Sequence, residues 1–154
     1  MQRGHTVRTG SWRIRPSLYA FAAPVTRHIL SAAHAPSTAC GLFHIFPKAY
    51  LQQELGASKG LYNQVANYAF LEKRMNIAIG KRAPRDYFGE ARDACAAGTG
   101  YFGDAETPAQ LAACMEANCV PAGVFDMDAG DYEHFLTEHR QLIAHKVRAY
   151  FEGL

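Results

Sequence analysis

The clearest pattern of hydrophobic positions lies at the end of the chain. Apolar side chains there recur with the i, i+3, i+4, i+7 spacing that places them on one side of an α-helix. The stripe comprises Tyr132, Phe135, Leu136, His139, Leu142, Ile143, Val147, Tyr150, Phe151 and Leu154. We therefore predict a helix over residues 132–154 that turns this stripe toward the core, with His139 packed inside it.

A second pattern, between residues 41 and 96, combines short β-prone runs with helical ones. "GLFHIF" predicts a short strand that ends at Pro47. "VANYAFL" has the β-branched and aromatic content of a second strand. "SKGLYNQ" indicates a loop. The predicted helices are "KAYLQQELG", "EKRMNIAIGK", "PRDYFGEARDACAA" and, capped by Thr107, "TPAQLAACMEANC". This order predicts an α+β fold: a small hairpin core packed against C-terminal helices, without a sheet of four or more strands.

Residues 1–37 follow neither pattern. They carry five arginines and no acid, and the first acidic residue of the chain is Glu54. Acid-poor, arginine-rich starts occur in organelle transit peptides, and they also arise where a reading frame changes or a start codon is misplaced. We expect residues 1–37 to be poorly ordered or non-native. Residues 38–154 are expected to form the domain, with the hairpin core over 38–83 and a helical extension over 84–154.

Composition narrows the class of protein. Hydrophobic residues make up 49% and charged residues 19% of the chain, as in a globular domain. No apolar run approaches the roughly 18 residues that a membrane span needs. The cysteines form no CxxC pair, so we expect reduced thiols in a cytoplasmic protein. They are Cys40, Cys95, Cys114 and Cys119.

The net charge of +2 is unevenly distributed along the chain. It divides into +5 for residues 1–37, +3 for residues 38–90 and −6 for residues 91–154, counting Lys and Arg against Asp and Glu. A basic N-terminal part and an acidic C-terminal part are typical of a protein that binds a polyanion with one face. Ordinary variation of surface charge also produces such differences.

Two short motifs resemble known binding sites, and neither fits the site it resembles. "GTGYFG", residues 98–103, fits G-x-G-x-x-G, but it follows a helix and runs into Asp104 and Glu106, which repel phosphate. His134 and His139 are five residues apart, whereas two zinc ligands on one helix need a spacing of four. We predict a loop at the first and no metal site at the second.

The residues around His44 give the strongest indication of chemistry. A metal-assisted phosphodiesterase needs a base for water, ligands for a divalent ion and cations for the phosphate backbone. A strand pair followed by a helix offers His44 on the first strand, Asn67 at the second strand and Asn76 in the helix. The accompanying cations are Lys48, Lys73, Arg74, Lys81, Arg82 and Arg85. Singly, each residue has a plainer explanation, as a packed histidine, a turn-forming asparagine or a solvated basic face.

The run "HIFPKAYL…YNQVANYAFLEKRMNIAIGKRAP…YF" resembles the HNH-type (His-Me finger) nuclease domain at the C-terminus of GmrSD-type modification-dependent restriction endonucleases. The resemblance extends from residue 43 to the closing "DYEHFLTEHRQLIAHKVRAYFEGL". The HNH domain of RNA-guided CRISPR nucleases is similar too, including the spacing of the two asparagines. The resemblance implies a ββα-metal hairpin core, a DNA substrate, Mg²⁺ or another divalent metal, and an NTPase-bearing, DNA-sensing domain or subunit in phage defence.

Carried onto this chain, the resemblance makes His44 the general base and Asn76 a metal ligand. Asn67 braces the hairpin by hydrogen bonding. One position departs, because the residue before the base is usually Asp, Glu or His and here is Phe43, which cannot bind Mg²⁺. If the scaffold is intact, Phe43→Asp or Phe43→His is expected to raise metal-dependent activity.

Two functions therefore follow from the sequence. The first is a metal-dependent DNA endonuclease, and the alternative is an inactive, truncated or frameshifted remnant that only binds nucleic acid or a partner. A single frame change or false start just upstream of His44 would explain three features together. These are the absence of acidic residues before Glu54, the lack of hydrophobic periodicity before residue 41 and the phenylalanine at position 43 in place of a metal ligand. We then expect another upstream frame to end in Asp, Glu or His before "HIFP".

Overall fold

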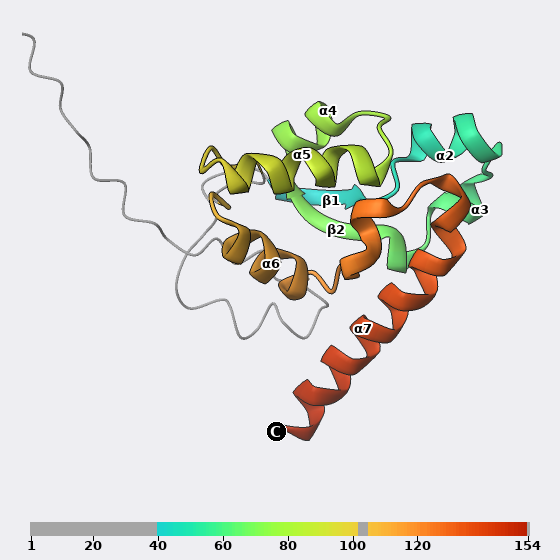
Figure 1. Ribbon diagram of the computed structural model, residues 1–154. Coiled ribbons are helices and arrows are strands. Elements are labelled where there is room, and N and C mark those ends of the chain that lie inside the picture. The colour runs from blue at the N-terminus through green and yellow to red at the C-terminus, as the bar shows by residue number, and fades with distance from the viewer. Residues whose placement is uncertain (1–39, 102–104, 154) are drawn as a thin grey trace, which may run out of the picture.

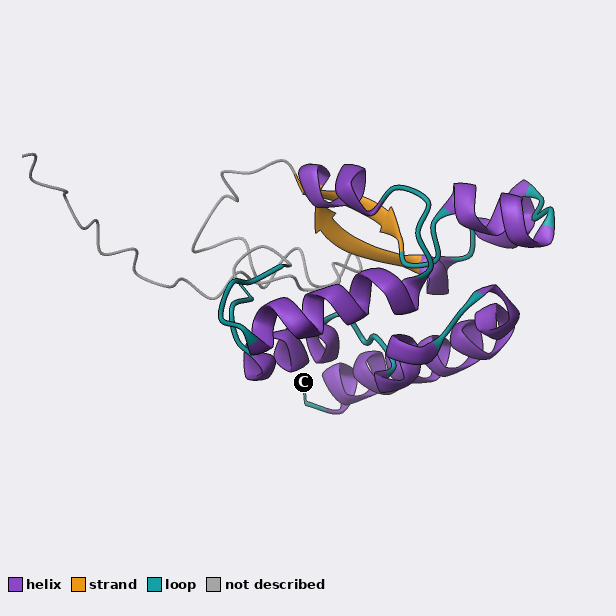
Figure 2. Ribbon diagram, turned by 45° about the horizontal axis from the view of Figure 1, so that its top comes forward, coloured by secondary structure: helices purple, strands orange, loops and turns teal. Residues whose placement is uncertain are grey.

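The computed structural model describes residues 40–101 and 105–153, so the predicted N-terminal segment, 1–37, lies outside the described residues. Within them the fold is α+β, as predicted: helices surround a small two-stranded antiparallel sheet (Figures 1 and 2). The elements are β1 (Cys40–His44), α2 (Lys48–Leu55), α3 (Lys59–Tyr62), η1 (Val65–Asn67), β2 (Tyr68–Glu72), α4 (Lys73–Ile79), α5 (Pro84–Ala96), α6 (Pro108–Ala117), η2 (Ala122–Asp126), η3 (Ala129–Asp131) and α7 (Tyr132–Glu152).

The two faces of the sheet have different surroundings. β1 and β2 pair so that His44 lies opposite Tyr68 and Phe43 lies opposite Ala69. Because successive side chains of a strand point to opposite faces, Phe43 and His44 point away from each other. Phe43 and Ala69 are buried, whereas Leu42, on the same face as His44, is 58% exposed. One face of the sheet therefore joins the core, and His44 lies on the other.

Glycine, proline and threonine set the helix boundaries where the sequence predicts them. α2 ends at Gly56 and α4 is followed by Gly80, both in the left-handed region with φ of 60° and 61°. Pro84 is the first residue of α5. At the start of α6, the Gln110 N–H donates to the Thr107 hydroxyl and the Thr107 N–H donates to the Gln110 side chain.

The connection between the strands differs from the prediction. The run "SKGLYNQ" contains the short helix α3, and the first residues of the predicted second strand form η1 instead. The reason is local hydrogen bonding, because the Asn67 N–H donates to the Gln64 carbonyl at 2.8 Å and so closes a turn. The strand consequently begins at Tyr68.

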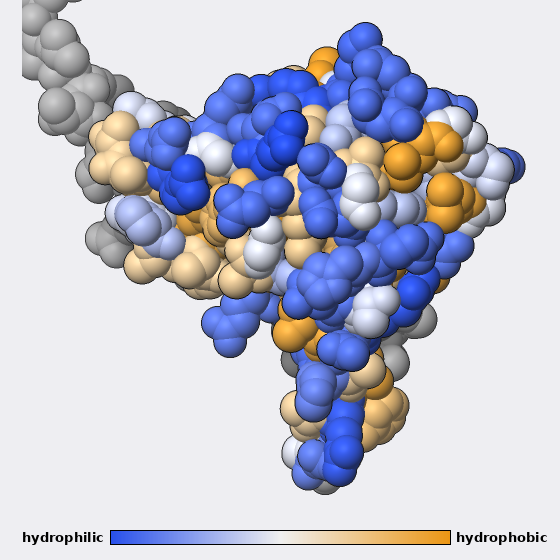
Figure 3. Space-filling model, turned by 45° about the vertical axis from the view of Figure 1, so that its right-hand side comes forward, coloured by the Kyte–Doolittle hydropathy of each residue, from blue (hydrophilic) through white to orange (hydrophobic). Residues whose placement is uncertain are grey.

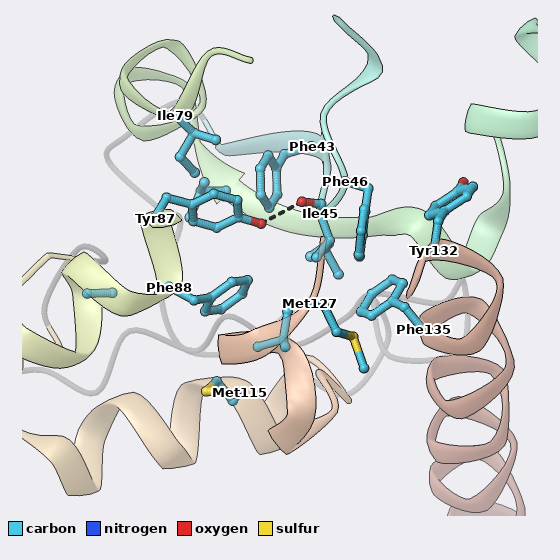
Figure 4. Close-up of a cluster of buried hydrophobic side chains, with 14 of the residues drawn as sticks. Phe43, Ile45, Phe46, Ile79, Tyr87, Phe88, Met115, Met127, Tyr132 and Phe135 are labelled. Carbon is cyan, nitrogen blue, oxygen red and sulfur yellow. Dashed lines mark hydrogen bonds between the residues drawn. The ribbon is translucent and has the colours of Figure 1, made fainter. Parts of the chain in front are cut away.

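Aromatic side chains far apart in the sequence meet in the core (Figure 4). The ring of Phe46 lies 4.9 Å from that of Phe135 and 5.1 Å from that of Tyr132, between ring centroids. Tyr87 of α5 is fully buried, and its hydroxyl donates to the Ile45 carbonyl at 2.6 Å. Burial raises the pKa of the Tyr87 hydroxyl, so it stays a neutral donor. This bond fixes α5 against the residues that follow β1.

The predicted core-facing stripe of the last helix is buried only in its first part. Its buried members are Tyr132, Phe135, Leu136 and His139, in the first turns of α7. Farther along, Val147 is 42% exposed and Phe151 is 59% exposed, because the helix extends away from the body (Figures 1 and 3). None of the described helices, α7 included, has the length and apolar character needed to cross a membrane.

His139 is packed inside the fold, as predicted. Its ring is fully buried, with Nδ1 2.6 Å from the Ala66 carbonyl oxygen and Nε2 3.0 Å from the Asn118 carbonyl oxygen. Burial lowers the pKa of His139 more than these two carbonyl groups raise it. A neutral imidazole has one N–H and donates to only one of these carbonyls at a time, so the ring packs between η1, the end of α6 and α7 while it resists protonation.

Because the pKa of His139 is lowered on folding, the domain is expected to lose stability as the pH falls below the unfolded-state value of about 6.5. In that range the unfolded chain binds a proton that the folded chain does not. Each pH unit of acidification therefore lowers the free energy of unfolding by up to about 1.4 kcal/mol. Urea unfolding between neutral and mildly acidic pH measures this dependence. His139→Gln is expected to flatten it, and an unchanged slope in that variant would contradict the assignment.

Candidate functional site

His44 occupies the last position of β1, where the chain leaves the sheet. Its half-buried ring packs on Tyr68, with 4.6 Å between ring centroids, and lies edge-on to Tyr62 at 6.0 Å. The Nε2 atom is 3.1 Å from the Asn63 side-chain oxygen, which also accepts a hydrogen bond from the Tyr68 hydroxyl at 3.0 Å. β1, the end of α3 and β2 thus hold the imidazole in one orientation.

Asn67 connects the segments on which His44 and Asn63 stand. Its side chain is fully buried and makes three hydrogen bonds. The oxygen accepts from the Phe46 N–H at 2.8 Å, and the amide nitrogen donates to the Phe46 carbonyl at 3.1 Å and the Tyr62 carbonyl at 3.0 Å. A short buried amide therefore satisfies backbone groups on both sides of the site.

Phe43, at the position where the resemblance places a metal ligand, belongs to the core. It is only 5% exposed and meets the ring of Tyr87 edge-on, with 6.3 Å between centroids. Figure 4 shows these two rings beside Ile79 of α4. The space on this side of β1 is consequently apolar.

Asn76, the predicted metal ligand, is exposed on α4. The hydrogen bonds and ring contacts of His44 among the described residues go to Asn63, Tyr62 and Tyr68, and none goes to Asn76. The described part of the chain also contains no group of three His, Cys, Asp or Glu side chains that could hold a metal ion. Mg²⁺ prefers carboxylates and several further oxygen ligands, and Asn76 supplies a single amide oxygen.

Of the six predicted DNA-binding cations, Lys48 shares a contact residue with His44. Its ammonium group is 5.4 Å from the centre of the Tyr62 ring, the ring that also contacts His44. Lys73 is exposed at the start of α4, and the side chain of Arg74 lies outside what the structure describes.

The other three cations are held by protein groups. Arg82 donates to the Glu90 carboxylate at 2.5 Å and to the Tyr101 hydroxyl at 2.7 Å. The hydrogen bonds that Glu90 accepts from Arg82 and from Tyr101 hold its pKa below its usual range. Arg85 pairs with Asp128 at 3.0 Å. Lys81 donates to the Gln53 side chain at 3.4 Å. These contacts join α4 and α5 to their neighbours, in addition to any role toward phosphate.

Reasoning from the sequence did not single out Asn63, Tyr68 or Tyr62. They lie 18 to 24 positions from His44, and only the pairing of His44 with Tyr68 and the turn of α3 bring them to it. The available signal was the predicted pairing of the two strands, but with these strands predicted at residues 41–46 and 65–71 it did not fix which residue lies opposite His44.

The chain matches no protein-family model, and searches of curated proteins and of solved structures found no similar protein.

Proposed function

We propose that the domain binds DNA and hydrolyses its phosphodiester bonds with His44 as the general base, as a nuclease of a restriction-type defence system. One observation supports this most strongly. The His44 ring is held at Nε2 by Asn63, while Nδ1 has no hydrogen-bond partner among the described residues. A half-buried imidazole with one fixed and one available nitrogen is suited to take a proton from water.

In this proposal Nδ1 of His44 removes a proton from a water molecule as the water oxygen attacks phosphorus. The bond from phosphorus to the leaving deoxyribose oxygen breaks, and that oxygen takes up a proton from solvent. The imidazolium formed is stabilised by the Asn63 oxygen at Nε2. Lys48, close to the Tyr62 ring, supplies positive charge toward the phosphate backbone. The Asn67 bonds keep the segments that carry these groups in register.

The test is nicking of a supercoiled plasmid by the purified chain, with Mg²⁺, with Mn²⁺ and with EDTA. His44→Ala is expected to lower the rate at least about 100-fold, because general-base catalysis contributes that much. His134→Ala is the matched control, since His134 is an exposed histidine of α7 paired with Glu138. Equal rates for the wild type and His44→Ala would rule out His44 as the base. The EDTA arm decides whether a divalent ion takes part.

The burial of Phe43 supports a second candidate, a non-catalytic domain that binds DNA or a partner subunit. It predicts DNA binding that weakens steeply with salt, as expected when Lys and Arg neutralise phosphates. It also predicts no nicking by the wild type with either ion. Nicking that depends on His44 would eliminate this candidate.

A further inference from the structure

The Asn63 side-chain oxygen is shared by two donors from two different strands. It lies 3.1 Å from Nε2 of His44, at the end of β1, and 3.0 Å from the Tyr68 hydroxyl, at the start of β2. The two rings are themselves in contact, with centroids 4.6 Å apart. Asn63 follows the last turn of α3, where its backbone N–H bonds to the Lys59 carbonyl.

We infer that Asn63, supported by Tyr68, is a positioning residue that fixes the tautomer of His44. An amide oxygen only accepts hydrogen bonds, so the imidazole must present an N–H at Nε2. A neutral imidazole has one N–H, which leaves the lone pair on Nδ1. The Tyr68 hydroxyl donates to the same oxygen and thereby keeps the amide turned with its oxygen toward His44.

The tautomer decides which nitrogen of His44 can act as the base, a role that rests on the proposed function. The nitrogen that faces Asn63 cannot act as a base, because it already carries the proton. Nδ1 is the nitrogen able to accept one from water. After the transfer both nitrogens carry protons, and the Nε2–H bond to Asn63 persists, so the product state needs no rearrangement of the ring.

Nitrogen NMR of the histidine ring tests the tautomer without any need for activity. At a pH where His44 is neutral, the wild type is expected to show the Nε2–H form, with a ring proton protected from exchange with water. His44→Ala identifies the signal. Asn63→Leu is expected to remove the protection and to mix the tautomers, whereas Gln141→Leu, an exposed amide of α7, is expected to change nothing.

A dominant Nδ1–H form in the wild type would overturn the inference, because it requires the Asn63 amide to present its NH₂ group. A signal that Asn63→Leu leaves unchanged would also overturn it. The Nε2–H form with the expected loss in Asn63→Leu supports the inference even if the wild type nicks no DNA, and in that case only the proposed function fails.

If the chain does nick DNA, kinetics provide a second readout. Asn63→Leu is expected to lower the rate about tenfold or more, as when partners that orient a catalytic histidine are removed. Asn63→Asp keeps the acceptor and adds a negative charge that favours the imidazolium. It is expected to retain the Nε2–H form and to move the acid limb of the pH–rate profile to higher pH. An unmoved profile in Asn63→Asp would argue against a contact with the catalytic imidazole.

Discussion

Phe43→Asp is expected to unfold the domain rather than to restore a metal site. The ring is 5% exposed, and the cluster around it contains Tyr87 and Ile79. Removing a buried phenylalanine side chain costs about 3–5 kcal/mol, and placing a carboxylate in the same apolar space adds to that cost. The sum is comparable with the whole stability of a typical domain, about 5–15 kcal/mol. Urea unfolding followed by far-UV circular dichroism measures the loss.

Leu42→Asp is the matched control for this substitution. Leu42 is the neighbouring residue of β1 and lies on the opposite face, 58% exposed. A new carboxylate there stays in water, so the change in the free energy of unfolding is expected to remain within about 1 kcal/mol. Suppose instead that Phe43→Asp folds as well as Leu42→Asp and nicks DNA faster with Mg²⁺. Position 43 would then face the catalytic side, and the restored-ligand expectation from the sequence would hold.

The sequence predicts most element boundaries here because these depend on local chemistry. Gly56 and Gly80 supply left-handed backbone after α2 and α4, and Thr107 caps α6 with its own side chain. These effects act over a few residues, so they are visible without knowledge of the fold. The helical content after the hairpin follows from the same kind of signal.

What the sequence did not predict depends on contacts between distant segments. "GLFHIF" is apolar on both sides of His44, so its pattern does not reveal that Phe43 enters the core while Leu42 stays exposed. In α7 the periodicity identifies an apolar side, but only packing decides that it is covered as far as His139. The Asn63 contact to His44 likewise requires the strand register and the turn of α3 together.

Asn67→Ala is expected to destabilise the domain by about 3–5 kcal/mol, because it removes three buried hydrogen bonds at once. The substitution leaves the Phe46 N–H and the carbonyls of Phe46 and Tyr62 without these partners, and water cannot readily reach a site whose central residue is fully buried. The melting temperature is expected to fall by at least about 10 °C for a domain of this size.

Asn76→Ala is the control that shows whether the loss of stability comes from the burial of Asn67 or from replacing any asparagine with alanine. Asn76 is the same residue nine positions later, but it is exposed on α4, where alanine favours the helix. Its replacement is expected to change stability by no more than about 0.5 kcal/mol. Because Asn67 also joins the segments that carry His44 and Asn63, Asn67→Ala should loosen the His44 ring even below its melting temperature. Equal stability of the two variants would mean that water can replace the hydrogen bonds of Asn67, and that another contact holds the two-stranded sheet to α3.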